Sequence, residues 1–373
     1  MRKQRENFDT EKKKGIFNKK RVIAVIAVFL LVAVMVFSNP EVRQFFLETK
    51  DVNVSFQAGA DYEAVVFGKE MLLVNKDGIR AIDRKGRESW SIVMPNTAPS
   101  LDKADKYILL ADLNGTSVNV YEKDKIISQI KTEREILSAK LNKNGYVAVA
   151  TDELGYKGSV TVFDKNGTDI FKWSSGSGYI GDIDISPKKK LAVAQLMTDK
   201  DEAYSRIMII DTSSDKEAKC IAEVDGLVMR LQYKDNGGLI AVSDTAVHGF
   251  KKNGKIDFKI DFGGRCLEGF NIENKGNMVL AFDGGLNNSV LESYSSNGKL
   301  RGTYETKGEM TAFDVNGECI LSASRTGIAR VTPSGKEKNR VEVSRDVKKM
   351  KIFPGRNEAL IIGSGSAEIV KIK

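Results

Sequence analysis

A short apolar run of strand length recurs through most of this chain at a spacing of about 40 residues. A chain with such a period has to stack its units, because one unit alone is too small to bury its apolar residues. Each of the first seven runs is followed by a polar turn that closes with Gly or Asp, as at residues 82–86 and 163–167. The eight runs occupy residues 71–74, 107–111, 146–150, 191–194, 239–242, 278–282, 319–321 and 360–362.

Each unit reads as four short strands: an alternating strand, the apolar run, a strand that enters the turn, and a half-exposed last strand. Antiparallel four-stranded units of about 40 residues are the blades of β-propellers. Eight blades need about 320 residues at this spacing, and residues 51–373 supply them. We therefore predict an all-β fold, an eight-bladed β-propeller of four-stranded antiparallel blades, with seven blades as the alternative.

The two ends of the repeat region are predicted to meet. The last unit has three strands and no fourth, whereas residues 52–57 form a strand-like segment before the first unit. Pairing this segment with the last unit closes the ring and removes the exposed strand edges that an open stack of blades leaves.

An uninterrupted apolar run at residues 22–37 precedes the repeats and follows the basic flank Lys19-Lys20-Arg21. A membrane-spanning helix needs about 20 residues, and snorkelling of the basic flank makes up the small deficit. Lys and Arg next to a span stay in the cytoplasm. A cleaved secretory signal, which would release a soluble binding protein, and a buried core helix are the alternatives. The predicted order is a basic cytoplasmic tail (residues 1–21), one transmembrane helix (22–38), a linker (39–50) and an extracytoplasmic β-propeller (51–373).

The positive net charge of +8 is concentrated in the N-terminal tail. Residues 1–21 contain nine Lys or Arg and three Asp or Glu, a net charge of +6, which leaves +2 for the rest of the chain. A basic surface for DNA or RNA is therefore not expected on the propeller, and no nucleic-acid partner is predicted.

The repeat region gives little support to catalysis or cofactor binding. The chain contains one histidine, His248, in a predicted strand, and no G-x-S-x-G nucleophile motif. The G-x-G-x-x-G match at residues 176–181 is followed by an alternating strand instead of the helix that a dinucleotide site requires. No cofactor, metal ion or catalytic residue is therefore predicted.

The three cysteines are spaced too far apart for a zinc site and are odd in number. We expect Cys220, Cys266 and Cys319 to be small buried fillers within strands, with a disulfide between Cys266 and Cys319 as the alternative. None of them follows the apolar run at residues 22–37, so a lipid anchor of the bacterial lipoprotein type is not expected.

Acid and amide side chains repeatedly follow the apolar runs. In an up-and-down blade the loops after the second and fourth strands lie on one face of the ring, so these residues are predicted to make that opening acidic. Turn formation at strand ends is the simpler explanation. The functional interpretation is a binding face for a cationic partner, a metal ion or a sugar, with tyrosines adding flat contact area. The candidate binding residues are Asp77, Asp112, Asp152, Glu153, Asp199, Asp201, Glu202, Asp244 and Asp283, together with Tyr156, Tyr179 and Tyr204.

The units resemble a known type of repeat. The turn at residues 82–86, followed by Glu88-Ser89-Trp90, resembles the quinoprotein-type repeat of β-propellers. Over residues 20–373 the layout resembles an uncharacterised family of singly membrane-anchored β-propeller proteins of Gram-positive bacteria. By blade style the domain is also similar to the lipid-anchored periplasmic propeller that scaffolds outer-membrane protein assembly and has no chemistry of its own. The many-Trp pattern of true quinoproteins is not matched, because only Trp90 and Trp173 are present.

Together these observations predict a non-enzymatic, membrane-anchored, extracytoplasmic propeller that is a binding or scaffold platform for a cell-envelope protein or glycan. The alternative from a different class is a propeller enzyme that acts on a glycan through paired carboxylates at the acidic face. The expected partners are the membrane and an envelope protein or glycan.

Overall fold

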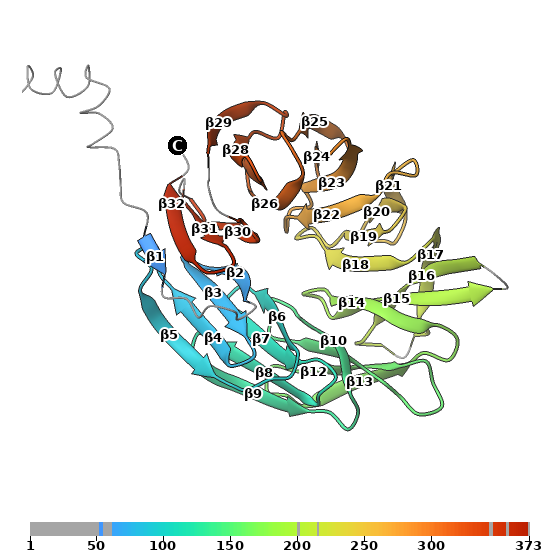
Figure 1. Cartoon of the computed structure of the whole chain (residues 1–373). Helices are drawn as coiled ribbons and strands as arrows, with labels where there is room; N and C mark the ends of the chain where they lie inside the picture. The colour runs from blue at the N-terminus through green and yellow to red at the C-terminus, as the bar shows by residue number, and fades with distance from the viewer. Residues whose placement is uncertain are drawn as a thin grey trace, which may run out of the picture. The chain divides into compact units, whose positions relative to one another are not determined.

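The computed structural model describes residues 52–54, 62–199, 202–214, 216–342, 346–355 and 358–371. Its described strands form eight four-stranded antiparallel sheets, and these sheets are arranged as blades around a central axis (Figure 1). The predicted all-β, eight-bladed propeller is therefore confirmed, and the seven-bladed alternative is wrong. The predicted tail, transmembrane helix and linker (residues 1–21, 22–38 and 39–50) lie outside the described residues.

The first strand of each blade is innermost, and neighbouring first strands contact one another around the axis (Figure 1). Charged and polar residues alternate with buried apolar residues along several of these strands, as in Asp182, Ile183 and Asp184. The innermost strands of blades 1 to 8 are β2 (Glu63–Phe67), β6 (Pro99–Ala104), β10 (Ile136–Leu141), β14 (Tyr179–Ile185), β18 (Val228–Tyr233), β22 (Leu267–Ile272), β26 (Met310–Asn316) and β30 (Lys349–Ile352).

The second strands are the apolar runs of the sequence, and each is buried on both sides because each blade packs between two others. In blade 2, Leu109 and Ala111 pack against blade 3, whereas Ile108 and Leu110 pack against blade 1. Continuous apolar runs therefore replace the usual alternation. The second strands are β3 (Glu70–Asn75), β7 (Tyr107–Asp112), β11 (Val147–Thr151), β15 (Lys190–Asp199), β19 (Leu239–Ser243), β23 (Met278–Gly285), β27 (Cys319–Ser324) and β31 (Glu358–Ile362).

In blades 1 to 7 the third and fourth strands are joined by the predicted polar turns. In blade 3 the Asp164 Oδ1 atom accepts the backbone N–H groups of Asn166 and Thr168, both at 2.9 Å. Gly167 has a φ of 84°, a left-handed conformation that favours glycine at the end of this turn. The third strands are β4 (Gly78–Ile82), β8 (Ser117–Glu122), β12 (Ser159–Phe163), β16 (Glu202–Asp211), β20 (Ala246–Phe250), β24 (Asn288–Tyr294), β28 (Gly327–Val331) and β32 (Ala367–Lys371). The outermost strands are β5 (Glu88–Val93), β9 (Lys125–Lys131), β13 (Asp169–Ser174), β17 (Lys219–Asp225), β21 (Ile256–Asp261), β25 (Leu300–Glu305), β29 (Glu337–Val341) and, in blade 8, β1 (Val52–Val54).

The ring is closed by a strand from the opposite end of the propeller region, as predicted. Strand β1 pairs with β32, so that Val52 lies opposite Ile369 and Val54 lies opposite Ala367. The Val54 side chain is buried in a cluster that includes residues of blades 8 and 1, among them Phe353. The N-terminal strand thus provides the missing fourth strand of the last blade.

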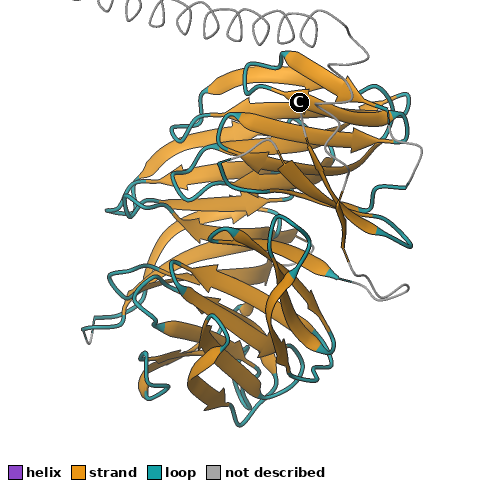
Figure 2. Ribbon diagram, turned by 90° about the vertical axis from the view of Figure 1, so that its left-hand side faces the viewer, coloured by secondary structure: helices purple, strands orange, loops and turns teal. Residues whose placement is uncertain are grey.

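Strands alternate in direction, so the loops lie on two opposite faces of the ring (Figure 2). We call one of them the 2–3 face: it carries the loops from second to third strands and the connections between blades, such as residues 152–158 and 226–227. The other is the 1–2 face, which carries the loops from first to second and from third to fourth strands, such as residues 186–189 and 251–255.

The expectation for the cysteines is wrong. Cys220 and Cys266 are exposed, Cys319 is half-buried, and all three are free, so Cys266 and Cys319 do not form a disulfide. Cys220 lies on the outermost strand β17, where side chains face solvent, and Cys266 lies in the connection before β22. Within the described ranges, no helix has the length and apolar character needed to cross a bilayer.

Candidate functional site

The predicted acidic residues that the structure describes lie near the ends of second strands, at the start of third strands, or in the loops between them, all on the 2–3 face. They are distributed over blades 1 to 6, so each blade contributes only one or two of them. In the part of the chain that the structure describes, no three Asp, Glu, His or Cys side chains are grouped closely enough to hold a metal ion. The described members are Asp77, Asp112, Asp152, Glu153, Asp199, Glu202, Asp244 and Asp283, whereas Asp201 lies outside the described residues.

Two of these carboxylates bind the backbone of the connection that enters their own blade. The Asp112 Oδ1 atom accepts hydrogen bonds from the N–H groups of Thr97 (2.8 Å) and Ala98 (2.9 Å). The Asp244 Oδ1 atom accepts one from the N–H group of Leu227 at 2.9 Å. Such bonds fix the loops of the 2–3 face by the local side-chain chemistry of Asp at strand ends.

Other members of the set are engaged locally as well. The Glu153 carboxylate lies 2.6 Å from the Lys172 ammonium and accepts a hydrogen bond from the Ser159 hydroxyl at 3.0 Å. The hydrogen bond from Lys172 is the main cause of a lowered pKa at Glu153. The Asp283 Oδ1 atom accepts the backbone N–H of Gly285 at 2.8 Å. The acidic residues therefore build loops more than they converge on one point.

The three predicted tyrosines are placed differently. Tyr179 is the first residue of the innermost strand β14 and is 58% exposed, and Tyr156 in the nearby 152–158 loop is 53% exposed. The Lys157 ammonium donates to the Tyr179 hydroxyl at 3.1 Å and lies 4.6 Å from the centre of its ring. Tyr204 is half-buried on the third strand β16, where its ring faces Arg206 instead. Lys157, the chain neighbour of Tyr156, thus joins the 152–158 loop to Tyr179, whereas the Tyr204 ring is paired with Arg206.

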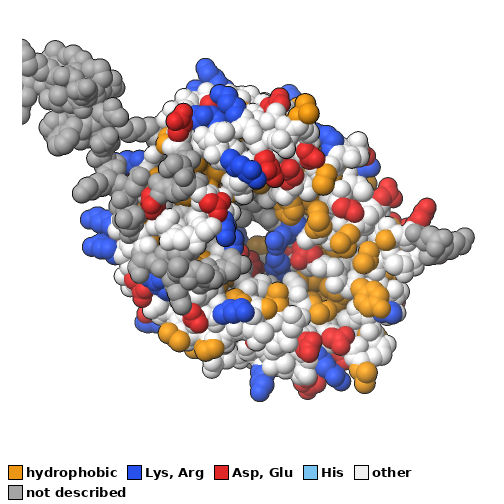
Figure 3. All heavy atoms as spheres, in the orientation of Figure 1, with side chains coloured by type: hydrophobic (Ala, Val, Ile, Leu, Met, Phe, Trp, Pro, Cys, Tyr) orange, Lys and Arg blue, Asp and Glu red, His pale blue; other side chains and the backbone are white. Residues whose placement is uncertain are grey.

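Apolar side chains surround these two tyrosines on the 2–3 face. Leu154 is 79% exposed, and Leu137 and Met229 are exposed near the starts of the innermost strands β10 and β18, on either side of β14. Figure 3 shows hydrophobic side chains gathered beside the central opening of the ring. We call this set the apolar crescent; its members are Leu137, Leu154, Tyr156, Tyr179, Leu227 and Met229.

Four residues of the apolar crescent were not among the sequence candidates. Leu227 and Met229 flank Val228, which is almost fully buried, so alternation along the strand turns both of them away from the core. Their signal was therefore present in the sequence as a three-residue apolar run that begins a first strand. The sequence candidates for the 2–3 face are acidic residues and tyrosines, so this apolar run is not among them.

The innermost strands also carry charged side chains around the central channel. These side chains are not among the sequence candidates. Acidic and basic residues are equally numerous in this set, and they interact electrostatically across the ring: Glu63 of blade 1 interacts with Arg230 of blade 5. Charged groups are visible around the opening in Figure 3. The members are Glu63, Asp102, Lys103, Lys140, Asp182, Asp184, Arg230, Asp314, Lys349 and Lys351.

Carboxylates of this channel set join neighbouring blades. The Asp182 Oδ2 atom accepts the backbone N–H of Leu231 in the next blade at 2.7 Å. The Asp314 carboxylate accepts the N–H of Ile352 and binds the Lys351 ammonium, both at 2.8 Å. These are well-placed bonds to charged acceptors, which contribute more to stability than neutral ones.

Asp184 and Asp102 make the same type of bond from their own blades. The Asp184 Oδ2 atom accepts the N–H of Tyr233 at 2.5 Å, and the Asp102 Oδ2 atom accepts the N–H of Leu141 at 2.7 Å. Burial, to which the nearby charge of Asp102 adds, raises the pKa of Asp184 to about 7. The channel carboxylates are therefore structural links between first strands.

The single histidine does not belong to either site. His248 is buried in the third strand β20, where the sequence predicts a strand, and burial lowers its pKa, which favours the neutral ring. Its Nδ1 atom has no hydrogen-bond partner among the described residues.

The closed ring of four-stranded blades defines the class of this protein as a β-propeller. The chain belongs to a protein family, DUF5711, described as a family of unknown function, whose model matches residues 47–372. No curated protein sequence matches the chain significantly.

Several solved propellers are similar in fold. The computationally designed Ika8 protein is 13% identical, with a TM-score of 0.59 over 86% of this chain and 99% of its own. BamB from Moraxella catarrhalis is 12% identical, with a TM-score of 0.53 over 87% of this chain and all of its own. Sqt1 from Saccharomyces cerevisiae is 12% identical, with a TM-score of 0.58 over 86% of this chain and all of its own. At this level of identity the similarity concerns the fold alone.

Proposed function

We propose that this protein is a non-enzymatic platform, anchored to the membrane by residues 22–38, whose extracytoplasmic propeller binds a cell-envelope protein through the apolar crescent. The observation that carries the proposal is the grouping of six exposed apolar side chains beside the channel opening. Soluble proteins rarely expose apolar side chains together, and such patches mark sites of protein interaction.

The composition of the patch indicates how a partner binds. Tyr179 and Tyr156 are rigid amphipathic anchors of the kind that dominate binding energy in protein interfaces. Glu135 and Asp152 are exposed near the crescent, and their backbones are joined by a hydrogen bond of 3.1 Å. A partner that fits this surface presents apolar side chains at its centre and basic side chains at its rim.

The engagement of the predicted acidic residues supports a binding role over the glycan-cleaving alternative. Cleavage of a glycosidic bond needs two carboxylates that face one substrate, one of them with a raised pKa. Asp112, Asp244 and Asp283 instead hold loop backbones in three different blades. The pKa of Glu153 is lowered, which favours the ionised form and not a proton donor.

In-cell crosslinking of the full-length protein, with mass spectrometry of the captured partners, tests the proposal. The double variant Tyr179→Asp/Leu227→Asp places two charges in the crescent. We expect it to lose a specific envelope protein that the wild type captures, with affinity of the purified pair lowered at least about 100-fold, as for two interface hot spots. A second variant neutralises Asp112, Asp152, Asp199, Asp201 and Asp283 and measures the contribution of the acidic residues.

The matched control is Val93→Asp/Leu286→Asp, which places two charges on the same face but outside the crescent, at side chains that are 86% and 98% exposed. Capture by the control but not by the crescent variant supports the platform. Equal capture by all variants contradicts it, and capture of no protein at all favours a glycan or small molecule. Protection of the propeller from protease in intact cells would contradict the extracytoplasmic location.

A further inference from the structure

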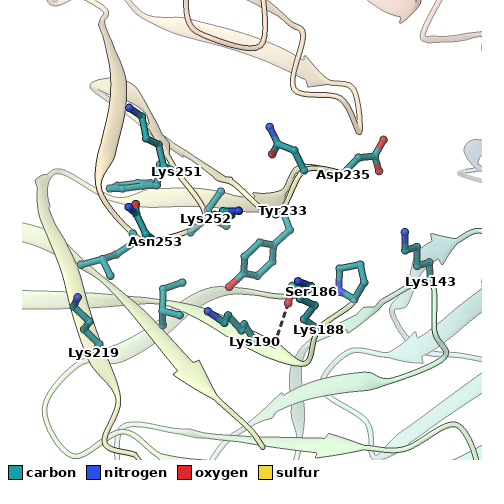
Figure 4. A pocket seen from close by; sticks show the side chains of 18 residues that line it. Lys143, Ser186, Lys188, Lys190, Lys219, Tyr233, Asp235, Lys251, Lys252 and Asn253 are labelled. Carbon is teal, nitrogen blue, oxygen red and sulfur yellow. Dashed lines mark hydrogen bonds between the residues drawn. The ribbon is translucent and has the colours of Figure 1, made fainter.

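A cavity of about 360 Å³ lies on the 1–2 face between blades 4 and 5, on the opposite side of the ring from the apolar crescent. Its walls come from the first turn of blade 4, from the start of β17, and from the turn at residues 251–254 of blade 5 (Figure 4). Apolar side chains, Ile209, Ile221, Leu239 and Phe250, form part of the lining. The volume is in the range of small-molecule sites, which start at about 300 Å³.

The charged side chains of this cavity are almost all basic. Six lysines and a single carboxylate, Asp235, line it. Of these six lysines, only Lys251 has a carboxylate of the described residues in ion-pair range, that of Asp257 at 3.7 Å. Positive charges held together in this way repel one another, and an anion relieves the repulsion. The six are Lys143, Lys188, Lys190, Lys219, Lys251 and Lys252.

A buried donor points into the same space. The Tyr233 hydroxyl is inaccessible to solvent and has no hydrogen-bond partner among the described residues. Burial and the nearby charge of Asp184 raise the pKa of Tyr233 far above its ordinary value, so the hydroxyl stays protonated. Figure 4 shows the Tyr233 ring inside the cavity with its hydroxyl directed towards the side on which Lys190 lies. A ligand oxygen would satisfy a donor that is otherwise left unpaired.

The backbone on both sides of this donor is held in place. The Tyr233 N–H donates to the Asp184 carboxylate at 2.5 Å, and this bond fixes the backbone from which the Tyr233 side chain extends. Opposite, the Ser186 hydroxyl accepts the Lys190 N–H at 2.9 Å, the dashed line in Figure 4, and so fixes the lysine-bearing turn. The cavity is therefore preorganised by two residues that do not themselves need to move when a ligand binds.

The corresponding position between blades 1 and 2 shows that this excess of lysine belongs to one pair of blades. A cavity there, of about 560 Å³, is lined by three lysines and three acids. The Lys106 ammonium lies 2.9 Å from the Glu122 carboxylate. The two junctions share a place in the fold, but only the one between blades 4 and 5 has uncompensated positive charge. The three lysines of the balanced cavity are Lys106, Lys123 and Lys125, and its acids are Asp105, Glu122 and Asp124.

We propose that the cavity between blades 4 and 5 binds an organic phosphate that carries at least two phosphoryl groups. Lysine ammonium groups bind phosphate as point charges, and six of them line this cavity, enough to meet the charge of more than one phosphoryl group. The Tyr233 hydroxyl donates to one phosphoryl oxygen, and Ile221 and Phe250 contact the organic part. This site is independent of the apolar crescent.

Isothermal titration calorimetry of the full-length protein in detergent tests this proposal with four probes. Inorganic tripolyphosphate supplies charge alone, ADP a soluble organic diphosphate, a short-chain isoprenyl diphosphate a lipid diphosphate, and citrate a carboxylate. We expect tripolyphosphate to bind, citrate to bind at least tenfold more weakly, and either ADP or the isoprenyl diphosphate to bind more tightly than tripolyphosphate, which identifies the source. Absence of binding by all three phosphates overturns the proposal.

Two variants and a matched control locate the site. Tyr233→Phe removes only the hydroxyl, which has no partner to lose, so we expect unchanged folding and about tenfold weaker phosphate binding. Lys190→Gln/Lys219→Gln is expected to weaken it at least 30-fold. The control Lys123→Gln/Lys125→Gln removes the same charge from the balanced cavity and is expected to change affinity less than twofold. An equal loss in both lysine variants would mean diffuse attraction to the face and would overturn the site.

Discussion

The two faces of this propeller are built from the same eight blades but differ in what they expose. On the 2–3 face, carboxylates such as Asp112 and Asp244 bind loop backbone, and apolar side chains such as Tyr179 remain exposed. On the 1–2 face, between blades 4 and 5, five of the six cavity lysines have no acidic partner among the described residues, and a buried tyrosine hydroxyl lacks one as well. Polar side chains thus hold loops in place on the 2–3 face, whereas on the 1–2 face several of them remain able to bind a ligand.

This difference shows where a repeated fold has freedom to vary. The second strands are fixed by packing on both sides, so their residues report the fold. Loops on either face bear no such constraint, and neighbouring blades can therefore place similar side chains in balanced or unbalanced sets. The two cavities of the 1–2 face illustrate this freedom. The cavity between blades 1 and 2 has a balanced set of charges, whereas the cavity between blades 4 and 5 has an excess of lysine.

The largest expected effect comes from opening the ring, because both faces depend on its closure. Val54→Asp puts a charge on β1 at a side chain that is 5% exposed and packed between blades 8 and 1. We expect a loss of about 3–5 kcal/mol in the free energy of unfolding, measured with urea, and loss of binding at both faces. Val93→Asp, at an exposed position, is expected to change stability by less than about 0.5 kcal/mol. Unchanged stability of Val54→Asp would show that β1 does not hold the ring.

The next largest effect is the dependence of binding affinity on salt concentration, which is expected to differ between the two faces. Raising sodium chloride from about 50 to 500 mM shortens the Debye length and screens exposed lysines. We expect tripolyphosphate binding to weaken at least about tenfold, whereas partner binding at the apolar crescent changes less than about twofold, since apolar burial is not screened. Calorimetry at several salt concentrations measures both. A similar salt dependence at the two faces would show that the crescent binds by charge.

A pH dependence of stability is expected from Asp184, in the channel between the two faces. Its pKa is raised from 3.8 to about 7 on folding, so the folded state binds the proton more tightly than the unfolded state. The stability from this proton is present below pH 4 and is lost as the pH rises to about 7, with a slope of at most about 1.4 kcal/mol per pH unit.

Asp184→Asn removes this titration, so its urea midpoint is expected to fall less than that of the wild type between pH 5 and 8. Asp261→Asn is the control with the opposite sign, because a backbone hydrogen bond from Gly263 lowers the pKa of that exposed carboxylate. The urea midpoint of Asp261→Asn is expected to differ in its pH dependence from that of the wild type only below pH 4, where Asp261 of the wild type becomes protonated. Parallel pH curves for Asp184→Asn and the wild type would mean that Asp184 stays ionised.

The fold could be predicted almost completely from the sequence, and the candidate sites only in part. The apolar runs, the turn at residues 163–167 and the closing strand are local signals, and each reappears in the structure. Tyr156 and Tyr179 were predicted and are both exposed, but Leu137 and Met229 lie on the first strands of blades 3 and 5, on either side of Tyr179 in blade 4. No local pattern shows that the starts of three first strands meet at one opening.

The sequence by itself determined the period, the order of strands and the closure of the ring, because these depend on apolar spacing and turn chemistry within about 40 residues. Only the tertiary structure decided between eight and seven blades, which exposed side chains meet and which charges are paired. Tyr233 illustrates the reason: its place in strand β18 can be read locally, but the lysines that line the cavity with it come from segments of three blades. Packing between blades creates that environment, and packing is not written in any one repeat.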